Sequence, residues 1–139
     1  MKTDASCTLY RKYNGGYIRY RVAECHWQER KAANVVKSGQ QSADSVVVYI
    51  PATAMILGPG DAVFPSAELY PLIDTTHQKA TEDIIVKDIC DFEFNNSTEQ
   101  SVSDSLRSLR DQYEFYTIMS VDRLFYGPIH LQHIKISAR

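Results

Sequence analysis

The sequence predicts a mainly β, α+β fold: an antiparallel β-barrel or sandwich with one amphipathic helix at about 98–111 and a long protruding loop at about 51–79. At least six segments are rich in β-type residues, only one segment has a clear helical period, and prolines and glycines gather between 51 and 79. A chain of 139 residues, 44% of them hydrophobic, can build one buried core. We therefore expect residues 1–139 to form a single domain.

The chain is predicted to begin with a β-hairpin. A β-rich segment at 7–13 is followed by Asn14-Gly15-Gly16, and a second β pattern resumes at Tyr17. An Asn followed by two glycines between such segments is typical of a tight hairpin turn, so the first two strands should pair antiparallel. Residues 17–27 alternate with mixed chemistry on both faces, which indicates that the outer face contacts more than solvent.

Two further strands are predicted at about 31–37 and 45–50. The second of these reads Val46-Val47-Val48-Tyr49-Ile50 and is apolar on both faces. We expect the barrel interior to cover one face and a helix or a neighbouring subunit to cover the other. Pro51 ends the strand.

The segment 51–79 has no sustained period but contains many apolar side chains. Long loops without structure are usually functional or disordered, and disordered segments contain few apolar residues. We therefore expect this loop to order against a neighbouring subunit, with its own barrel as the alternative, and to be replaceable by a short linker without loss of folding. The interface candidates in it are Met55, Ile56, Leu57, Phe64, Leu69 and Tyr70.

The last third of the chain predicts a strand, a helix and a closing hairpin. Residues 83–94 alternate, with one mostly buried face. Ser97 or Thr98 can cap a helix whose apolar stripe is Val102, Leu106, Leu109 and Tyr113. Strands at about 113–121 and 129–137 flank a tip at 122–128. The tip exposes Leu124, Phe125 and Tyr126 unless a partner covers them, which makes these residues interface candidates too.

No pattern of catalytic or metal-binding residues is recognisable. The sequence lacks Cys-x-x-Cys, His-x-x-x-His and Gly-x-Ser-x-Gly, and Gly58-Pro59-Gly60 lacks the Lys and Ser or Thr of a phosphate loop. We therefore expect a protein that is not an enzyme and that holds no cofactor and no metal. Three cysteines are an odd number, so a disulfide framework is not expected and a reducing cytoplasm fits.

Charge and hydropathy exclude two further classes of protein. A net charge of −2 leaves no basic patch of the size that duplex DNA binding needs. No run of 18 apolar residues and no apolar signal core occur, so we expect a soluble, unexported protein.

The aromatic residues of the first hairpin support an alternative function. Four tyrosines and three arginines interleave on the first two strands: Tyr10, Tyr13, Tyr17, Tyr20, Arg11, Arg19 and Arg21. Such a surface could stack single-stranded bases and hold their phosphates. The competing interpretation is cross-strand aromatic pairing, with arginine stacking at a subunit interface. A monomeric β-barrel that binds single-stranded nucleic acid is therefore the second hypothesis.

Several short motifs, in order along most of the chain, resemble a known family. They are Thr8-Leu9-Tyr10, His26-Trp27, Ser42-Ala43-Asp44, Ile50-Pro51, Asp83-Ile84-Ile85-Val86-Lys87, Asp122-Arg123, Gly127 and His133. In these motifs and in size the chain is similar to the small neck proteins of tailed bacteriophages of Gram-positive bacteria, the head-tail connectors of the head-closure or tail-completion class.

The resemblance implies a non-enzymatic structural virion protein. Such a protein forms a homo-oligomeric ring that connects the head and portal to the tail and lines the DNA channel. Its partners would be portal or adaptor proteins and tail-terminator or tail-tube proteins. It would be made in the host bacterial cytoplasm and located in the virion neck, away from membranes.

A ring that DNA passes through should not hold the duplex, so its channel-facing residues should be neutral or acidic. Four carboxylates of the predicted 83–94 strand are our channel-facing candidates: Asp83, Asp88, Asp91 and Glu93. Packaged duplex DNA would then pass through without sequence-specific binding.

Overall fold

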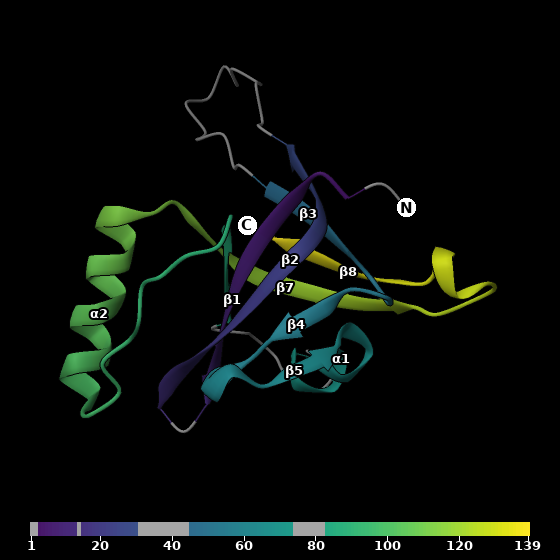
Figure 1. Ribbon diagram of the computed structural model, residues 1–139. Helices are drawn as coiled ribbons and strands as arrows, with labels where there is room; N and C mark the ends of the chain where they lie inside the picture. Colours follow the sequence, from purple (N-terminus) through teal and green to yellow (C-terminus); the bar gives the residue numbers. More distant parts are fainter. Residues whose placement is uncertain (1–2, 14, 31–44, 74–82) are drawn as a thin grey trace, which may run out of the picture.

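Antiparallel strands that close on themselves form the body of the protein (Figure 1). The computed structural model describes residues 3–13, 15–30, 45–73 and 83–139. The strands of the closed body are β1 (Ala5–Tyr13), β2 (Gly16–Arg30), β3 (Ser45–Pro51), β6 (Ile84–Lys87), β7 (Phe115–Leu124) and β8 (His133–Ala138). Pairing runs in the order β1-β6-β7-β8-β3-β2 and returns from β2 to β1. The predicted mainly β, α+β fold is confirmed.

The predicted hairpin at the start of the chain is confirmed. β1 and β2 pair antiparallel from Tyr13 opposite Gly16 to Ala5 opposite Cys25, and Gly15 in the turn has a φ of 80°. That left-handed conformation is unfavourable for a residue with a side chain, which explains a glycine in the turn. The strand predicted at about 31–37 lies outside the described residues.

The segment predicted as a protruding loop contains regular structure that packs on the barrel. It holds β4 (Met55–Leu57), a 3₁₀ turn η1 (Pro59–Asp61), β5 (Val63–Pro65) and helix α1 (Ser66–Ile73). β4 pairs with β2 at Arg21 and Val22, and β5 pairs with β4. The prediction of a long protruding loop is therefore wrong for the described part of 51–79, and a linker should not replace it without loss of folding.

The barrel interior is filled by aliphatic and aromatic side chains from all sides. Ile56 of β4 and Leu69 of α1 are fully buried in this core beside residues of the barrel strands. The buried hydroxyl of Ser66 donates to the carbonyl of Pro51 at 2.6 Å and fixes the start of α1. On β3, Val46, Val48 and Ile50 face the interior, and Val47 and Tyr49 are half-buried on the outer face.

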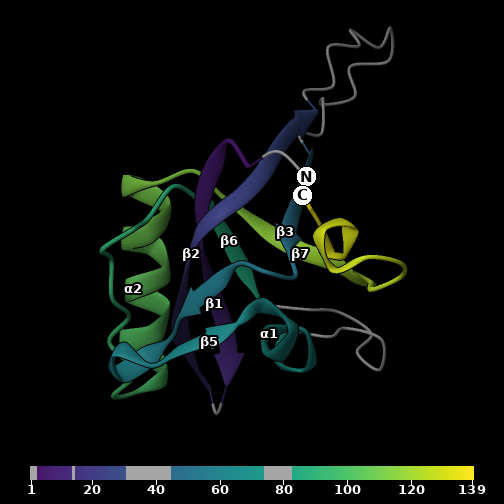
Figure 2. The same cartoon turned by 45° about the vertical axis from the view of Figure 1, so that its right-hand side comes forward.

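A second apolar cluster joins helix α2 (Glu99–Gln112) to the outer face of β1, β2, β6 and β7, and Figure 2 shows the helix standing beside the barrel. The helix confirms the prediction for 98–111. Thr98 accepts from the N–H of Ser101 at its start, and Val102 and Leu109 are buried. Tyr113, which was predicted as part of the stripe, follows the helix and is exposed.

Residues 88–96, here called the strap, lie between β6 and α2 without regular structure. The strand predicted over 83–94 therefore ends early, at Lys87, because Asp88 adopts a φ of 69°. The predicted buried face is kept beyond that point: Cys90, Phe92 and Phe94 still pack in the second cluster.

The strap is attached to β1 by a buried threonine. The Thr8 hydroxyl donates to the Asp88 carbonyl at 2.9 Å and accepts from the Cys90 N–H at 2.8 Å. The Tyr10 hydroxyl donates to the Phe92 carbonyl at 2.6 Å. Burial and the neighbouring Cys90 raise the pKa of the Tyr10 phenol, which therefore stays protonated as a donor.

Replacing Thr8 by valine should lower the free energy of unfolding by about 1–3 kcal/mol, because it leaves the two backbone groups of the strap without their partner. The matched control is Thr53→Val, which changes an exposed threonine in a turn and should alter stability by less than about 0.5 kcal/mol. Urea unfolding followed by circular dichroism measures both. Equal effects of the two substitutions would contradict the role assigned to Thr8.

The closing hairpin is longer and differently bounded than predicted. β7 continues to Leu124, and β8 begins only at His133. Residues Ile129–Leu131, which were predicted to begin the last strand, form a 3₁₀ turn, η2. Of the described helices, none has the length and apolar character needed to cross a membrane.

Candidate functional site

The β7–β8 hairpin projects beyond the barrel (Figure 1). Three large apolar side chains near its end are exposed. We call residues 125–132 the hairpin tip. Tyr126 is 75% exposed, Ile129 57% and Leu131 55%. The prediction that this tip presents apolar groups is therefore confirmed for Tyr126. It is wrong for Phe125, which packs against the barrel core, and for Leu124, which is half-buried.

The hairpin tip is braced from inside. The Arg123 guanidinium lies 5.3 Å from the ring of Tyr70 on α1 and 5.6 Å from the ring of Phe125. The Gln132 side-chain amide donates to the Gly127 carbonyl at 2.8 Å, and the Leu131 N–H donates to the Pro128 carbonyl at 2.9 Å. These contacts hold the exposed residues on a shaped turn.

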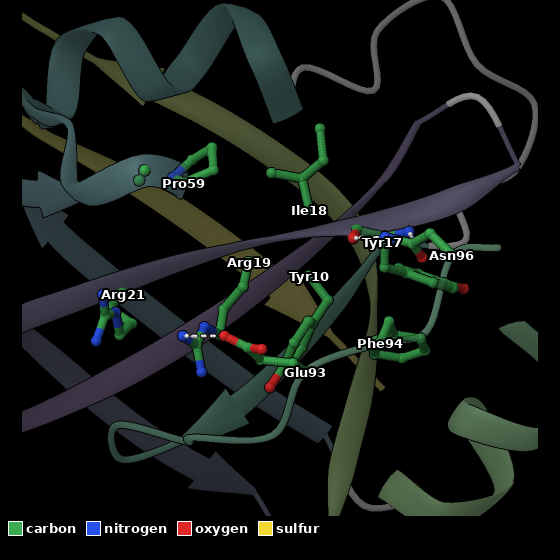
Figure 3. Close-up of a pocket in the computed structure, with 11 residues that line it drawn as sticks. Tyr10, Tyr17, Ile18, Arg19, Arg21, Pro59, Glu93, Phe94 and Asn96 are labelled. Carbon is green, nitrogen blue, oxygen red and sulfur yellow. Dashed lines mark hydrogen bonds and ion pairs between the residues drawn. The ribbon is translucent and has the colours of Figure 1, made fainter.

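A second feature, here called the cleft, lies over β2. It has a volume of about 390 Å³ and is bounded by Tyr17, Ile18, Arg19 and Arg21 of β2, the Gly58–Gly60 turn between β4 and β5, and the strap residues Glu93, Phe94 and Asn96. Figure 3 shows Arg19 beside Glu93 and Tyr17 beside Asn96 in this cleft. Sequence reasoning did not predict it, because the three segments that build it are far apart in the chain.

Two arginines give the cleft its charge. Arg19 donates to the Cys90 carbonyl at 3.1 Å and to the Glu93 carboxylate at 3.2 Å. The Glu93 side chain is 77% exposed, so water screens this ion pair strongly and it contributes little to stability. Arg21 lies two residues along β2, and side chains two residues apart share one face of a strand. Among the described lining residues, one carboxylate and two guanidinium groups carry charge, so their formal sum is positive.

The edge of β2 at the cleft is only partly paired. The Asn96 amide accepts from the Tyr17 N–H and donates to the Tyr17 carbonyl, both at 3.0 Å, and β4 pairs with β2 only at Arg21 and Val22. In the described part of the chain, no strand lies beside residues 18–20 on the edge of β2 that faces away from β1. A Cβ at Gly16 would lie 2.6 Å from the Asn96 Oδ1, so this close approach of the strap requires glycine.

The aromatic platform predicted on β1 and β2 is not available for stacking. Tyr10 packs in the cluster beneath α2, edge-to-face against Phe94 with ring centroids 5.2 Å apart. Tyr17 is buried in the same cluster, and Tyr20 is buried in the barrel interior. Tyr13 is half-exposed, with the Arg11 guanidinium 4.9 Å from its ring. The three buried rings contact Phe94 of the strap and Phe64 of β5. They therefore pack inside the molecule and do not form a surface on which bases could stack.

The interface candidates of 51–79 divide between core and surface. Ile56 and Leu69 are fully buried in the core, so the prediction that they form an interface is wrong. Phe64 and Tyr70 are partly buried and pack against the core, and Leu57 is half-buried. Only Met55, at 51% exposure, presents most of its side chain to solvent.

The four acidic candidates do not form one surface. Asp83 is buried, and its carboxylate accepts from the Lys12 N–H at 2.8 Å, so the prediction that it faces a channel is wrong. Asp88 and Asp91 are exposed on the strap. Glu93 is also exposed but pairs with Arg19 at the cleft.

Among the described residues, no group of three or more histidine, cysteine and carboxylate side chains is placed to hold a metal ion. The three cysteines are buried and free. The hydrogen bond with the neighbouring Cys25 thiol, together with burial, raises the pKa of Cys7, which keeps it a neutral thiol. Among the described residues that line the cleft, none is a serine, cysteine or histidine that could act as a nucleophile or base.

Sequence reasoning also missed Ile129 and Leu131 as exposed residues, because they were placed in a strand. The signal that could have found them is Gly127-Pro128: proline cannot donate to a strand ladder, and Gly127 has a φ of 71°. Strand pairing was therefore unfavourable immediately after the turn.

Comparisons with known proteins give one match. The model of a family described as a family of unknown function, DUF6751, matches residues 2–139. No curated protein and no solved structure matches this chain.

Proposed function

We propose that this chain, which belongs to the DUF6751 family of unknown function, is a non-enzymatic structural protein that assembles into a homo-oligomeric ring in the neck of a tailed bacteriophage. The observation that carries the proposal is the hairpin tip. It presents Tyr126, Ile129 and Leu131 to solvent on a braced turn that projects from the barrel. The motif resemblance to phage neck proteins supplies the setting.

The hairpin tip supports assembly because it exposes three large apolar side chains on one projection, and contact of such side chains with water is unfavourable. Large apolar side chains that gather on one projection are typical of protein interfaces, whereas single scattered ones are ordinary surface. Burying one such side chain contributes about 1.5–3 kcal/mol. Aromatic residues that enter a pocket on a partner often carry most of the binding energy of an interface.

The cleft favours binding over chemistry. Glu93, the carboxylate among the described lining residues, is in an ion pair with Arg19. Arginine keeps its charge throughout the working pH range, so the guanidinium groups of Arg19 and Arg21 supply fixed positive charge and no proton transfer. A pocket of this kind recognises a partner and does not convert a substrate.

The place in the neck follows from the same proposal. In a ring that lines the DNA channel, the exposed carboxylates of Asp88 and Asp91 on the strap are the candidates to face the duplex, since like charge prevents the duplex from adhering. Portal or adaptor proteins on one side and tail-terminator or tail-tube proteins on the other would be the partners.

Size-exclusion chromatography with light scattering tests the proposal. We expect the purified chain, of 15.8 kDa, to elute at several times its own mass, and the mass to rise with concentration. Single-stranded oligonucleotides and duplex DNA should leave the elution unchanged at physiological salt. Even a contact with a binding free energy of about −4 kcal/mol leaves roughly half of the copies assembled at about 1 mM. A chain that stays monomeric at every concentration up to that value would contradict the proposal.

A further inference from the structure

We infer that the hairpin tip of one copy enters the cleft of the next copy, so that the ring is built head to tail through these two surfaces. The inference rests on the proposed function, because it takes a second copy of this chain as the occupant of the cleft. It names a partner for the cleft, which neither the family match nor the sequence identifies.

The positions of the two surfaces fit a head-to-tail contact. In Figure 1 and Figure 2, the η2 turn of the tip lies at one end of the molecule, and the turn between β4 and β5 that borders the cleft lies at the opposite end. Two different patches at opposite ends give a heterologous contact, which generates a ring when the rotation between copies closes. A twofold dimer would instead use one patch on both copies.

The size of the cleft suits the exposed side chains of the tip. Its volume of about 390 Å³ lies within the range of roughly 300–1,000 Å³ that pockets for compact ligands occupy. Phe94 of the strap and Pro59 of the turn supply apolar walls, and Figure 3 shows them on different sides of β2. Tyr126 is the largest and most exposed of the tip residues and is therefore the one expected to enter deepest.

The chemistry of the cleft suits an aromatic residue. The Arg19 guanidinium, held by the Cys90 carbonyl and the Glu93 carboxylate, can stack its face on the Tyr126 ring, the arrangement that arginines of this chain adopt with their own aromatic neighbours at 4.9–5.6 Å. The partly paired edge of β2 beside Arg19 can also bond the backbone of an incoming segment.

Complementation between two defective variants tests this contact. The tip variant carries Tyr126→Ser and Leu131→Ser, and the cleft variant carries Pro59→Trp, which places a large ring in the cleft mouth at an exposed position. Each variant alone should be monomeric by light scattering. Mixed one to one, they should give a dimer and nothing larger, because the tip variant keeps its cleft and the cleft variant keeps its tip. Arg21→Met is the second cleft variant and should behave as Pro59→Trp does.

Each result separates the inference from the proposed function. The control Met119→Ser removes an apolar side chain of β7 that lies outside the tip and is about as exposed as Leu131, and this variant should assemble as the wild type does. If the wild type assembles but the mixture stays monomeric, or if both cleft variants still assemble, the contact is elsewhere and the ring proposal stands. If the wild type itself never assembles, both fail. A dimer from the mixture supports both.

Discussion

Replacing Ile56 by alanine is expected to lower the free energy of unfolding by about 2–5 kcal/mol, because the side chain is fully buried in the barrel core and its loss leaves a cavity. Ile56 lies on β4, within the segment whose sequence predicted a protruding loop. The size of the effect therefore measures whether this segment belongs to the fold. Urea unfolding followed by far-ultraviolet circular dichroism gives the value.

Met55→Ala is the matched control. Met55 is the neighbouring residue on the same strand but points to the other face, where half of it is exposed. It should change the free energy of unfolding by less than about 0.5 kcal/mol. If both substitutions lower the free energy of unfolding by the same small amount, β4 does not pack on the barrel and the account of this segment is wrong.

Replacing Tyr126, Ile129 and Leu131 together by serine is expected to abolish self-association while leaving the melting temperature of the monomer nearly unchanged. Each side chain that loses its burial at the interface removes about 1.5–3 kcal/mol, which alone weakens a contact roughly 10- to 150-fold. In the monomer these side chains already face solvent, so serine removes little packing. Light scattering and thermal unfolding measure the two quantities on one preparation.

Phe125→Ser is the comparison that separates interface from core. Phe125 is sequence neighbour to Tyr126 but packs against the barrel core beside Arg123. Its replacement should lower the melting temperature, whereas the triple replacement should not. If the triple variant melts well below the wild type, the tip folds back into the core and is no docking surface.

Periodic elements could be predicted from the sequence because each depends on local chemistry. The hairpin at Gly15 and helix α2, with its Thr98 cap, both form where turn and cap residues agree with the apolar period. The strap kept the predicted buried face through Phe92 and Phe94 even though the strand ended at Lys87.

The segment 52–73 could not be predicted for a physical reason. Three-residue strands are too short to display an alternation, and an eight-residue helix contains only two turns. Pro71 lies within α1 and argues locally against a helix. Burial of Leu69 against the barrel outweighs that local preference, and the sequence does not display a tertiary contact of this kind.

The cleft was missed for a similar reason. β2, the turn at Gly58–Gly60 and the strap meet only after the strands have paired. Arg19 and Arg21 were noticed for their spacing, but their partners, among them Glu93, come from distant parts of the chain. The tip could be found because a hairpin end is a local feature.

Images of the purified protein by electron microscopy test the central claim most directly, since they show whether copies of this chain close into a ring. We predict closed particles of one cyclic symmetry with a central opening, and the same particles reduced to monomers in the Tyr126→Ser, Ile129→Ser, Leu131→Ser variant. Monomers, twofold dimers or open filaments from the wild-type chain would contradict the claim.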